Sequence, residues 1–165
     1  MGFSDDDARW MRRAIGLAEA GNAAAGKNGI GCVIVRDGVV IGEGCNEVEL
    51  RCDATAHAEI VAMRRAGERL RCQELRGAVL YTTLQPCGMC SMACVWAKVG
   101  RIVFGAGRDD VHAMYFEDRH LDTVDFIRDA FREDLTLEGG LMARACAALY
   151  VPPDAEVPKR EQFNR

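Results

Sequence analysis

Apolar residues recur along the chain with two alternating periods, one helical and one extended. The first helical stretch follows Ser4, whose hydroxyl suits a helix N-cap, and three aspartates that suit the positive first turn. Apolar residues then return every three or four positions from 10 to 18. Glycines between 21 and 29 interrupt the pattern. We therefore expect an amphipathic helix that is broken between residues 21 and 29 and packs its apolar stripe on a sheet.

Five short runs rich in β-branched and aliphatic residues predict the strands of that sheet. The first two flank Asp37-Gly38, a pair typical of a tight hairpin, and are expected to be antiparallel. The later runs alternate with helical stretches, which favours parallel pairing through right-handed crossovers. The predicted strands cover residues 32–35, 39–41, 78–83, 102–106 and 135–137.

Four more helices are predicted between and after these strands. The one at 87–98 is apolar on nearly every face, which indicates burial. The predicted ranges are 57–67, 87–98, 121–131 and 141–149. We expect residues 1–150 to form a single domain, and the charged, proline-containing stretch 151–165 to be a mobile tail.

Two short motifs carry the side chains with the strongest chemistry. His57-Ala58-Glu59 offers an imidazole and a carboxylate, and Pro86-Cys87-Gly88-Met89-Cys90 offers two thiols. Cys87 and Cys90 are three residues apart at a helix start, so both sulfurs can reach one ion. His57 can point at the same ion from the start of another helix, because side chains lean toward the helix N-terminus. His57, Cys87 and Cys90 are therefore candidate zinc ligands, and three ligands leave the fourth tetrahedral position open for water.

A Cys-x-x-Cys motif alone is also typical of a redox pair, half of a structural zinc site or two buried thiols. Its combination with an upstream His-x-Glu, with a strand between them, is far more specific for a catalytic zinc. Cys94 could close the site as a fourth ligand, but it lies one helical turn, about 5 Å, deeper, where core packing is the expected role. The remaining cysteines are expected to be reduced core or surface residues. They are Cys32, Cys45, Cys52, Cys72 and Cys146.

Composition and charge exclude several classes of protein. The 165 residues suffice for one domain with a full core, and no apolar run approaches the length of a membrane span. The acidic N-terminus differs from the basic start of a signal peptide, so we expect a soluble, cytoplasmic protein without a membrane partner. The 21 Lys and Arg residues are interleaved with 25 Asp and Glu residues, for a net charge of −4. That balance argues against a nucleic-acid partner.

The two motifs resemble those of the cytidine and deoxycytidylate deaminase-like zinc enzymes, whose signature is H-x-E followed by P-C-x-x-C. The resembling text is Asp53-Ala-Thr-Ala-His57-Ala-Glu59-Ile60 and Leu80-Tyr81-Thr82-Thr83-Leu84-Gln85-Pro86-Cys87, within a likeness that spans approximately residues 8–150. The sequence is most similar to the branch that holds guanine deaminases, cytosine deaminases and tRNA adenosine deaminases. The resemblance implies a three-layer α/β/α fold with a five-stranded mixed sheet flanked by helices.

The resemblance also implies a role for individual residues. Glu59 is the implied catalytic proton carrier, and Asn46, Ala58 and Asp110 are the implied substrate contacts. Asn46 matches an asparagine that hydrogen-bonds the base in related deaminases, although an asparagine that simply ends a strand is the alternative. Asp110 matches a substrate-contacting aspartate of guanine deaminases. A carboxylate there could accept hydrogen bonds from an amino group and a ring N–H of guanine together.

The implied reaction is hydrolytic deamination of a free nucleobase, with guanine as the expected small-molecule substrate and xanthine and ammonia as products. Zinc would acidify the attacking water, and Glu59 would carry its proton to a ring nitrogen and then to the departing amine. Cytosine or a triazine-like ring is an alternative substrate. A tRNA adenosine deaminase shares every catalytic residue and is a further alternative. The alternative from another class is a zinc-stabilised interaction domain, in which Glu59 would have no purpose.

The expected assembly is a homodimer, as is usual for small deaminases of this resemblance. Met114, Tyr115 and Phe116 place three large apolar side chains in a predicted loop, where a monomer would leave them exposed to water. We therefore expect a partner subunit to cover them. In guanine deaminases a C-terminal segment reaches over the neighbouring pocket, and Phe163 could serve as such a lid here. A disordered tail is the alternative.

Overall fold

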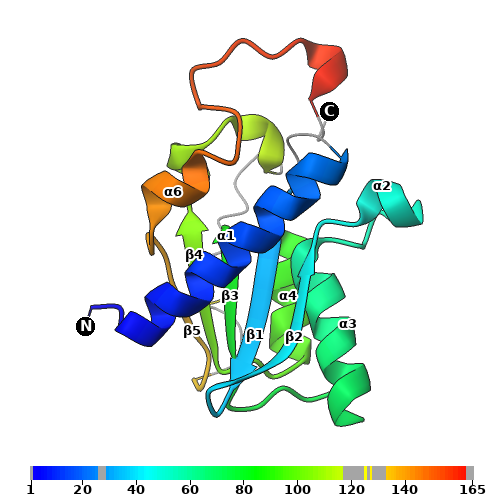
Figure 1. The fold of residues 1–165 in the computed structure, drawn as a ribbon, viewed down its shortest axis with the longest axis vertical. Helices are drawn as coiled ribbons and strands as arrows, with labels where there is room; N and C mark the ends of the chain where they lie inside the picture. The colour runs from blue at the N-terminus through cyan, green and yellow to red at the C-terminus, as the bar shows by residue number, and fades with distance from the viewer. Residues whose placement is uncertain (1, 26–28, 117–124, 126, 128–132, 163–165) are drawn as a thin grey trace.

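A five-stranded mixed sheet forms the centre of the computed structural model, which describes residues 2–25, 29–116, 125, 127 and 133–162 (Figure 1). The strand order is β2-β1-β3-β4-β5. β1 pairs antiparallel with β2 and β3, whereas β3, β4 and β5 are parallel. The strands are β1 (Gly31–Arg36), β2 (Val39–Cys45), β3 (Val79–Leu84), β4 (Arg101–Ala106) and β5 (Thr136–Glu138). The predicted mixed sheet is confirmed.

Helices cover both faces of the sheet, which gives the predicted three layers (Figure 1). α1 (Asp5–Ala25) and α6 (Ala143–Ala147) pack on one face, and α3 (Ala58–Leu70) and α4 (Gly88–Trp96) on the other. Side chains alternate along each strand, so neighbouring residues enter different cores. Tyr81 contributes to the core under α1, and Leu80 to the core under α3 and α4. The connections contain α2 (Val48–Arg51) and the 3₁₀ turns η1 (Arg108–Asp110), η2 (Ala113–Tyr115) and η3 (Lys159–Glu161).

α1 begins and ends where its sequence predicts. The Asp7 N–H donates to Ser4 Oγ at 3.1 Å, and the Ser4 N–H donates to Asp7 Oδ2 at 2.8 Å, so the two residues cap the helix reciprocally. The helix ends at Ala25, within the stretch 21–29 that was predicted to interrupt the pattern. Gly21 serves close packing, since a Cβ there would lie 3.2 Å from Cys45 Cβ.

Two glycines set how closely the helices approach the sheet. A Cβ on Gly31 of β1 would lie 1.9 Å from the Ala14 carbonyl oxygen of α1. A Cβ on Gly42 of β2 would lie 2.3 Å from the Ala62 carbonyl oxygen of α3. No larger residue fits without moving a helix. The backbone of β2 therefore fixes the position of α3, whose first turn carries His57 and Glu59.

A buried charge network joins the start of α1 to the sheet. Asp7 Oδ1 accepts hydrogen bonds from Tyr81 Oη at 2.8 Å and from Arg101 Nη1 at 2.7 Å. Burial raises the pKa of the Asp7 carboxyl, but the hydrogen bonds from Arg101, Ser4 and Tyr81 outweigh burial and lower it from 3.8 to about 2. These contacts link residues 94 positions apart in the sequence.

The lowered pKa of Asp7 predicts a pH-dependent contribution to stability. A carboxylate with a depressed folded-state pKa stabilises the protein above its ordinary pKa of 3.8 and loses that effect as pH falls toward about 2. The expected contribution is about 2 kcal/mol. Urea unfolding of the wild type and of Asp7→Asn should show a stability difference that shrinks between pH 4 and pH 2. A difference that stays constant through this window would contradict the assignment.

The prediction that residues 114–116 leave apolar side chains in water is wrong. Met114 and Phe116 are only 7% and 4% exposed, and the Arg108 guanidinium lies 4.6 Å from the centroid of the Phe116 ring. Tyr115 packs edge-on against Tyr150 with ring centroids 5.3 Å apart. The chain itself covers this segment, because α6 and the residues that follow it pack there. The reason for expecting a partner subunit at this place therefore falls away.

The C-terminal part differs from its predicted boundaries. α6 is shorter than 141–149, because Gly140 and Met142 both have positive φ and delay the helix start. Residues 151–162 leave α6 in an arc that ends in η3 (Figure 1), and the His112 N–H donates to the Val151 carbonyl at 2.8 Å. Most of the predicted helix 121–131 lies outside the described residues. The same holds for His120, just before it, and for Phe163. No helix in the described part of the chain combines the length and apolar character needed to cross a membrane.

Candidate active site

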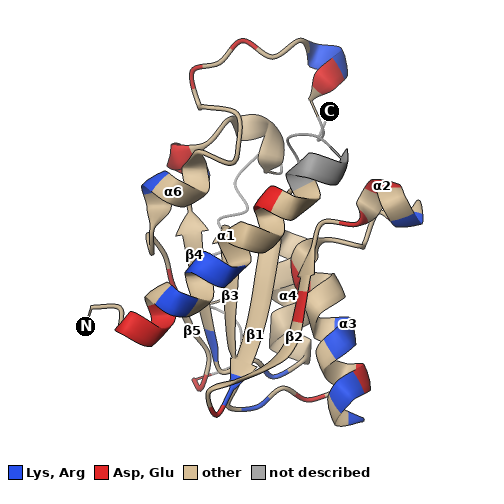
Figure 2. Cartoon of the chain, viewed as in Figure 1, with Lys and Arg blue, Asp and Glu red and all other residues tan. Residues whose placement is uncertain are grey.

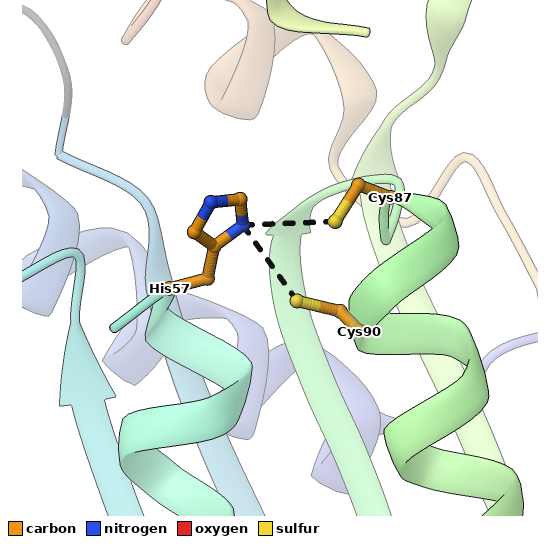
Figure 3. Close-up of side chains that lie close together, drawn as sticks. All are labelled: His57, Cys87 and Cys90. Atoms are coloured by element: carbon orange, nitrogen blue, oxygen red, sulfur yellow. Dashed lines mark hydrogen bonds between the residues drawn. The ribbon is translucent and has the colours of Figure 1, made fainter. Parts of the chain in front are cut away.

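The two chemical motifs occupy the N-termini of two neighbouring helices, as predicted. His57 is the N-cap of α3, and Cys87 is the N-cap of α4. β3 delivers the chain to α4 through Gln85 and Pro86, so the site lies at the carboxyl end of the parallel strands. Figure 3 shows the His57 ring pointing from α3 toward the sulfurs of Cys87 and Cys90 on α4. The fold thus brings together side chains about thirty residues apart.

The spacing of the three donor atoms fits a zinc ion. His57 Nδ1 lies 3.6 Å from Cys87 Sγ and 3.7 Å from Cys90 Sγ. All three ligand atoms lie within 4.8 Å of one another. A tetrahedral zinc with Zn–S of about 2.3 Å and Zn–N of about 2.05 Å has an S···N edge of about 3.6 Å. One imidazole and two thiols at this spacing form a donor set that zinc prefers.

The two thiols differ in acidity. The Cys90 thiol and His57 stabilise the Cys87 thiolate and, against the opposing effect of burial, lower the pKa of Cys87 to about 5. The interaction with Cys87, together with burial, raises the pKa of Cys90. The first turn of α4 favours negative charge on both sulfurs.

Glu59 lies directly behind the donor set. Its side chain is 3% exposed, with Oε2 3.5 Å from Cys90 Sγ and Oε1 3.2 Å from Thr82 Oγ1. Burial, and next the charge of Cys87, raise the pKa of Glu59. A carboxyl group with a raised pKa holds a proton more readily than an ordinary glutamate, which suits general acid-base chemistry.

Cys94 stays in the core, as expected. It is fully buried among apolar residues beneath α3 and α4 and does not join the three-residue donor cluster. Burial, and next the charge of Glu59, raise its pKa, which keeps it a neutral thiol. The described cysteines are all free, with Cys32 and Cys146 buried and Cys52 and Cys72 exposed. Among the described residues the donor cluster therefore keeps three protein ligands.

The three predicted substrate contacts lie on different elements of the fold. Ala58 is buried between His57 and Glu59 in the first turn of α3. Asn46 directly follows β2 and is half-buried, and its backbone N–H donates to the Ile30 carbonyl at 3.0 Å. Asp110 is exposed in η1. Contact of these residues with a substrate remains a prediction.

A backbone hydrogen bond orients the Asp110 carboxylate. Oδ2 accepts from the Gly107 N–H at 2.8 Å. A Cβ on Gly107 would lie 3.6 Å from both Asp110 Oδ2 and Gln85 Oε1, so both side chains border Gly107. Gln85 is 7% exposed, and its backbone N–H donates to the Ala106 carbonyl at 2.8 Å.

Thr82 and Gln85 were not among the predicted site residues. Both precede Cys87 on or just after β3, in a stretch that reads as an ordinary β-branched strand. A polar residue on a strand that is buried on both faces needs a partner inside the protein. The pattern of β3 therefore indicates that such a partner exists, without identifying it.

Comparison with known proteins agrees with this geometry. Residues 4–106 match the model of the cytidine and deoxycytidylate deaminase zinc-binding region. Guanine deaminase of Bacillus subtilis is 38% identical over 109 residues, which cover 66% of this chain and 70% of that protein. A tRNA-specific adenosine deaminase of Buchnera aphidicola is 40% identical over 111 residues, which cover 66% and 71%.

Solved structures of the same two kinds of enzyme share the fold. A guanine deaminase from Nitrosomonas europaea has a TM-score of 0.74 at 26% identity, with 90% of this chain and 84% of that chain covered. A structure from work on tRNA:A34 deaminases has a TM-score of 0.70 at 31% identity and covers 86% and 98%. The predicted resemblance, the hydrolytic deaminase activity and zinc as the cofactor are confirmed at the level of the family. This chain belongs to the cytidine and deoxycytidylate deaminase family of zinc-dependent hydrolytic deaminases.

Proposed function

We propose that this protein deaminates a free purine base, with guanine as the substrate and xanthine and ammonia as the products. The exposed Asp110 carboxylate, held by the Gly107 N–H in the connection that follows β4, carries this choice. Guanine presents a ring N–H beside the exocyclic amino group that leaves as ammonia, and a carboxylate can accept hydrogen bonds from both. Adenine has no such pair of donors on its base-pairing edge. One hydrogen bond from Gly107 leaves the carboxylate further acceptor sites, because it has about four in all.

His57, Cys87 and Cys90 are the proposed zinc ligands, and Glu59 is the proposed proton carrier. When bound, zinc would act as a Lewis acid and would lower the pKa of a water molecule to near neutrality. The Glu59 carboxylate would accept a proton from the attacking water, because Oε2 lies beside the donor set. It then protonates a ring nitrogen and finally the departing amine, which its raised pKa favours. The N-terminus of α4 stabilises the negative charge that develops on the ring.

The arginines of α2 and α3 support a small uncharged substrate over a polyanion. Arg65 lies 2.7 Å from the buried Glu47 carboxylate, which also binds Arg51, and Arg64 lies 3.2 Å from Asp53. Figure 2 shows acidic and basic segments alternating over the described chain. A surface that gains affinity by neutralising phosphates presents cations without such carboxylate partners. These arginines are therefore already compensated within the protein.

A tRNA adenosine deaminase is the second candidate, because most of the similar curated proteins carry that name. The two candidates share the residues proposed for catalysis and differ in the substrate. Ammonia release should be measured from guanine, cytosine, adenine and a tRNA anticodon stem-loop containing adenosine. Release from guanine supports the proposal. Release from the stem-loop alone would replace the proposal with the tRNA activity, and release from cytosine alone would favour a cytosine-type enzyme.

Asp110→Asn should lower kcat/KM for guanine by roughly 30-fold, or about 2 kcal/mol of transition-state stabilisation. The amide exchanges one acceptor oxygen for a donor that faces the N–H groups of guanine. An asparagine oxygen can still accept from the Gly107 N–H, so η1 should persist and zinc content should not change. Asp109→Asn is the matched control, because Asp109 is an exposed acid in the same turn. Equal kinetics of both variants and the wild type would contradict the role of Asp110.

We also propose that the protein is a homodimer and that α4 provides the interface. Met89, Met92 and Trp96 are 36%, 37% and 78% exposed and follow one another at helical spacing. Arg71 and Glu74 are among the residues that line the adjoining groove between α3 and α4, so two copies related by a two-fold axis can match opposite charges. Methionine and aromatic side chains are enriched at such interfaces.

Trp96→Glu is expected to convert the dimer to a monomer in light scattering, because it would bury a charge at the C-terminal end of the α4 stripe. Leu50→Glu is the control, since Leu50 is 82% exposed on α2, away from this stripe. This variant should remain dimeric. A monomeric wild type, or a dimer that survives Trp96→Glu, would exclude this interface.

A further inference from the structure

We propose that Thr82 is a positioning residue that holds Glu59 in its working orientation. Thr82 Oγ1 donates to Glu59 Oε1 at 3.2 Å, while Cys90 Sγ lies 3.5 Å from Glu59 Oε2. The two oxygens of the carboxylate therefore have different neighbours. One oxygen is held by the sheet, and the other faces the donor cluster where the proton is transferred. This inference rests on the proposed role of Glu59 as the proton carrier.

The setting of Thr82 makes it a rigid anchor. Its side chain is fully buried in the middle of β3, where it pairs with Cys32 on one neighbouring strand and with Phe104 on the other. A threonine on a strand has few χ1 rotamers, and a strand held on both sides cannot shift its register. The hydroxyl therefore stays in one place relative to the helix that carries Glu59.

Glu59 needs such an anchor because its own backbone restrains it little. The carboxylate carbon lies three rotatable bonds from the Glu59 Cα in the first turn of α3, and the terminal torsion of the side chain is broad. Proton transfer requires the oxygen lone pair to point at the reacting atoms, and small misplacements slow such steps strongly. A second fixed contact on Oε1 selects the orientation in which Oε2 faces the site. Thr82 is fully buried and therefore acts through Glu59 rather than by touching the substrate.

Thr83 provides a control of the same residue type. It is also fully buried, but it points to the opposite face of the sheet. Its Oγ1 accepts from the Gly31 N–H at 3.1 Å and shares a 2.5 Å hydrogen bond with Tyr150 Oη. Removing this hydroxyl costs two buried hydrogen bonds without touching Glu59. Any effect of a buried threonine on stability alone should therefore appear at Thr83 at least as strongly as at Thr82.

The kinetic test compares Thr82→Val, Thr82→Ser and Thr83→Val in the zinc-loaded protein with guanine. Thr82→Val is expected to lower kcat by about tenfold or more while KM changes by less than about twofold and zinc content stays constant. Thr82→Ser keeps the hydroxyl and should restore kcat to within about threefold of the wild type. Thr83→Val should keep kcat. An unchanged kcat in Thr82→Val, or an equal loss in Thr82→Ser or Thr83→Val, would overturn the positioning role.

A double-mutant cycle tests the contact without any measurement of activity. The urea midpoint is measured for the wild type, Thr82→Val, Glu59→Ala and the double variant, all at the same zinc concentration. If Thr82 holds the carboxylate, the shift caused by Thr82→Val should be smaller when Glu59 is already absent. Additive shifts would overturn the contact. A non-additive cycle in a protein that does not convert guanine would support the contact while excluding guanine as the substrate.

Discussion

Glu59→Gln is expected to lower ammonia release by about 1,000-fold or more while zinc content stays at about one ion per chain. Glutamine has nearly the same shape as glutamate and can still accept the hydrogen bond from Thr82, so the site should stay assembled. What it loses is the ability to bind and release a proton. Because the same group is proposed to serve several proton transfers, the loss should fall on kcat more than on KM.

Stability should move in the opposite direction to activity in this variant. Glu59 is a buried carboxylate whose pKa burial raises, which means that the fold disfavours its charge. A neutral glutamine should therefore leave the free energy of unfolding unchanged or slightly higher. Asp7→Asn is the control, since it removes another buried carboxylate far along the sheet from the site and should lower stability while keeping kcat. Full activity in Glu59→Gln would rule out the proton-carrier role.

Local patterns in the sequence were sufficient to predict most of the helices and strands. The Asp37-Gly38 pair predicts a tight hairpin, and both residues have positive φ, at 54° and 72°, as a type I′ turn requires. The start of α3 at His57 and the start of α4 at Cys87 also follow from local signals, which is why the ligand set could be assembled before the structure was known. These features depend on neighbouring residues only.

Features that depend on distant partners were missed. The apolar segment 114–116 reads as exposed until Tyr150 and Val151 are seen to cover it. Asp7 reads as one of three equivalent acids in a first turn, and only its pairing with Arg101 in space sets it apart. The contact of Thr82 with Glu59 belongs to the same class, because it depends on how α3 lies across the sheet. No local period specifies which of two buried threonines faces the site.

Cys90→Ala is expected to abolish zinc binding, because it removes one of three ligands and leaves too few donors at tetrahedral spacing. The wild type should melt at a lower temperature after chelation of zinc, whereas the variant should melt at the same temperature with and without chelator. At free zinc a thousandfold above the dissociation constant, the linked stabilisation of the wild type is about 4 kcal/mol. Cys87→Ala and His57→Ala should behave in the same way. Metal analysis of the purified variants gives the direct measurement.

Cys94→Ala separates loss of metal from loss of packing. Cys94 lies on the same helix as Cys90 and is equally buried, but its surroundings are the apolar core. Its truncation should lower stability by about 1 kcal/mol through lost packing and leave zinc content unchanged, so that the variant still responds to chelation. If Cys94→Ala lost its zinc, the site would have four protein ligands and no open position for water. Zinc would then hold the fold together without taking part in deamination, and the role proposed for Glu59 would fall with it.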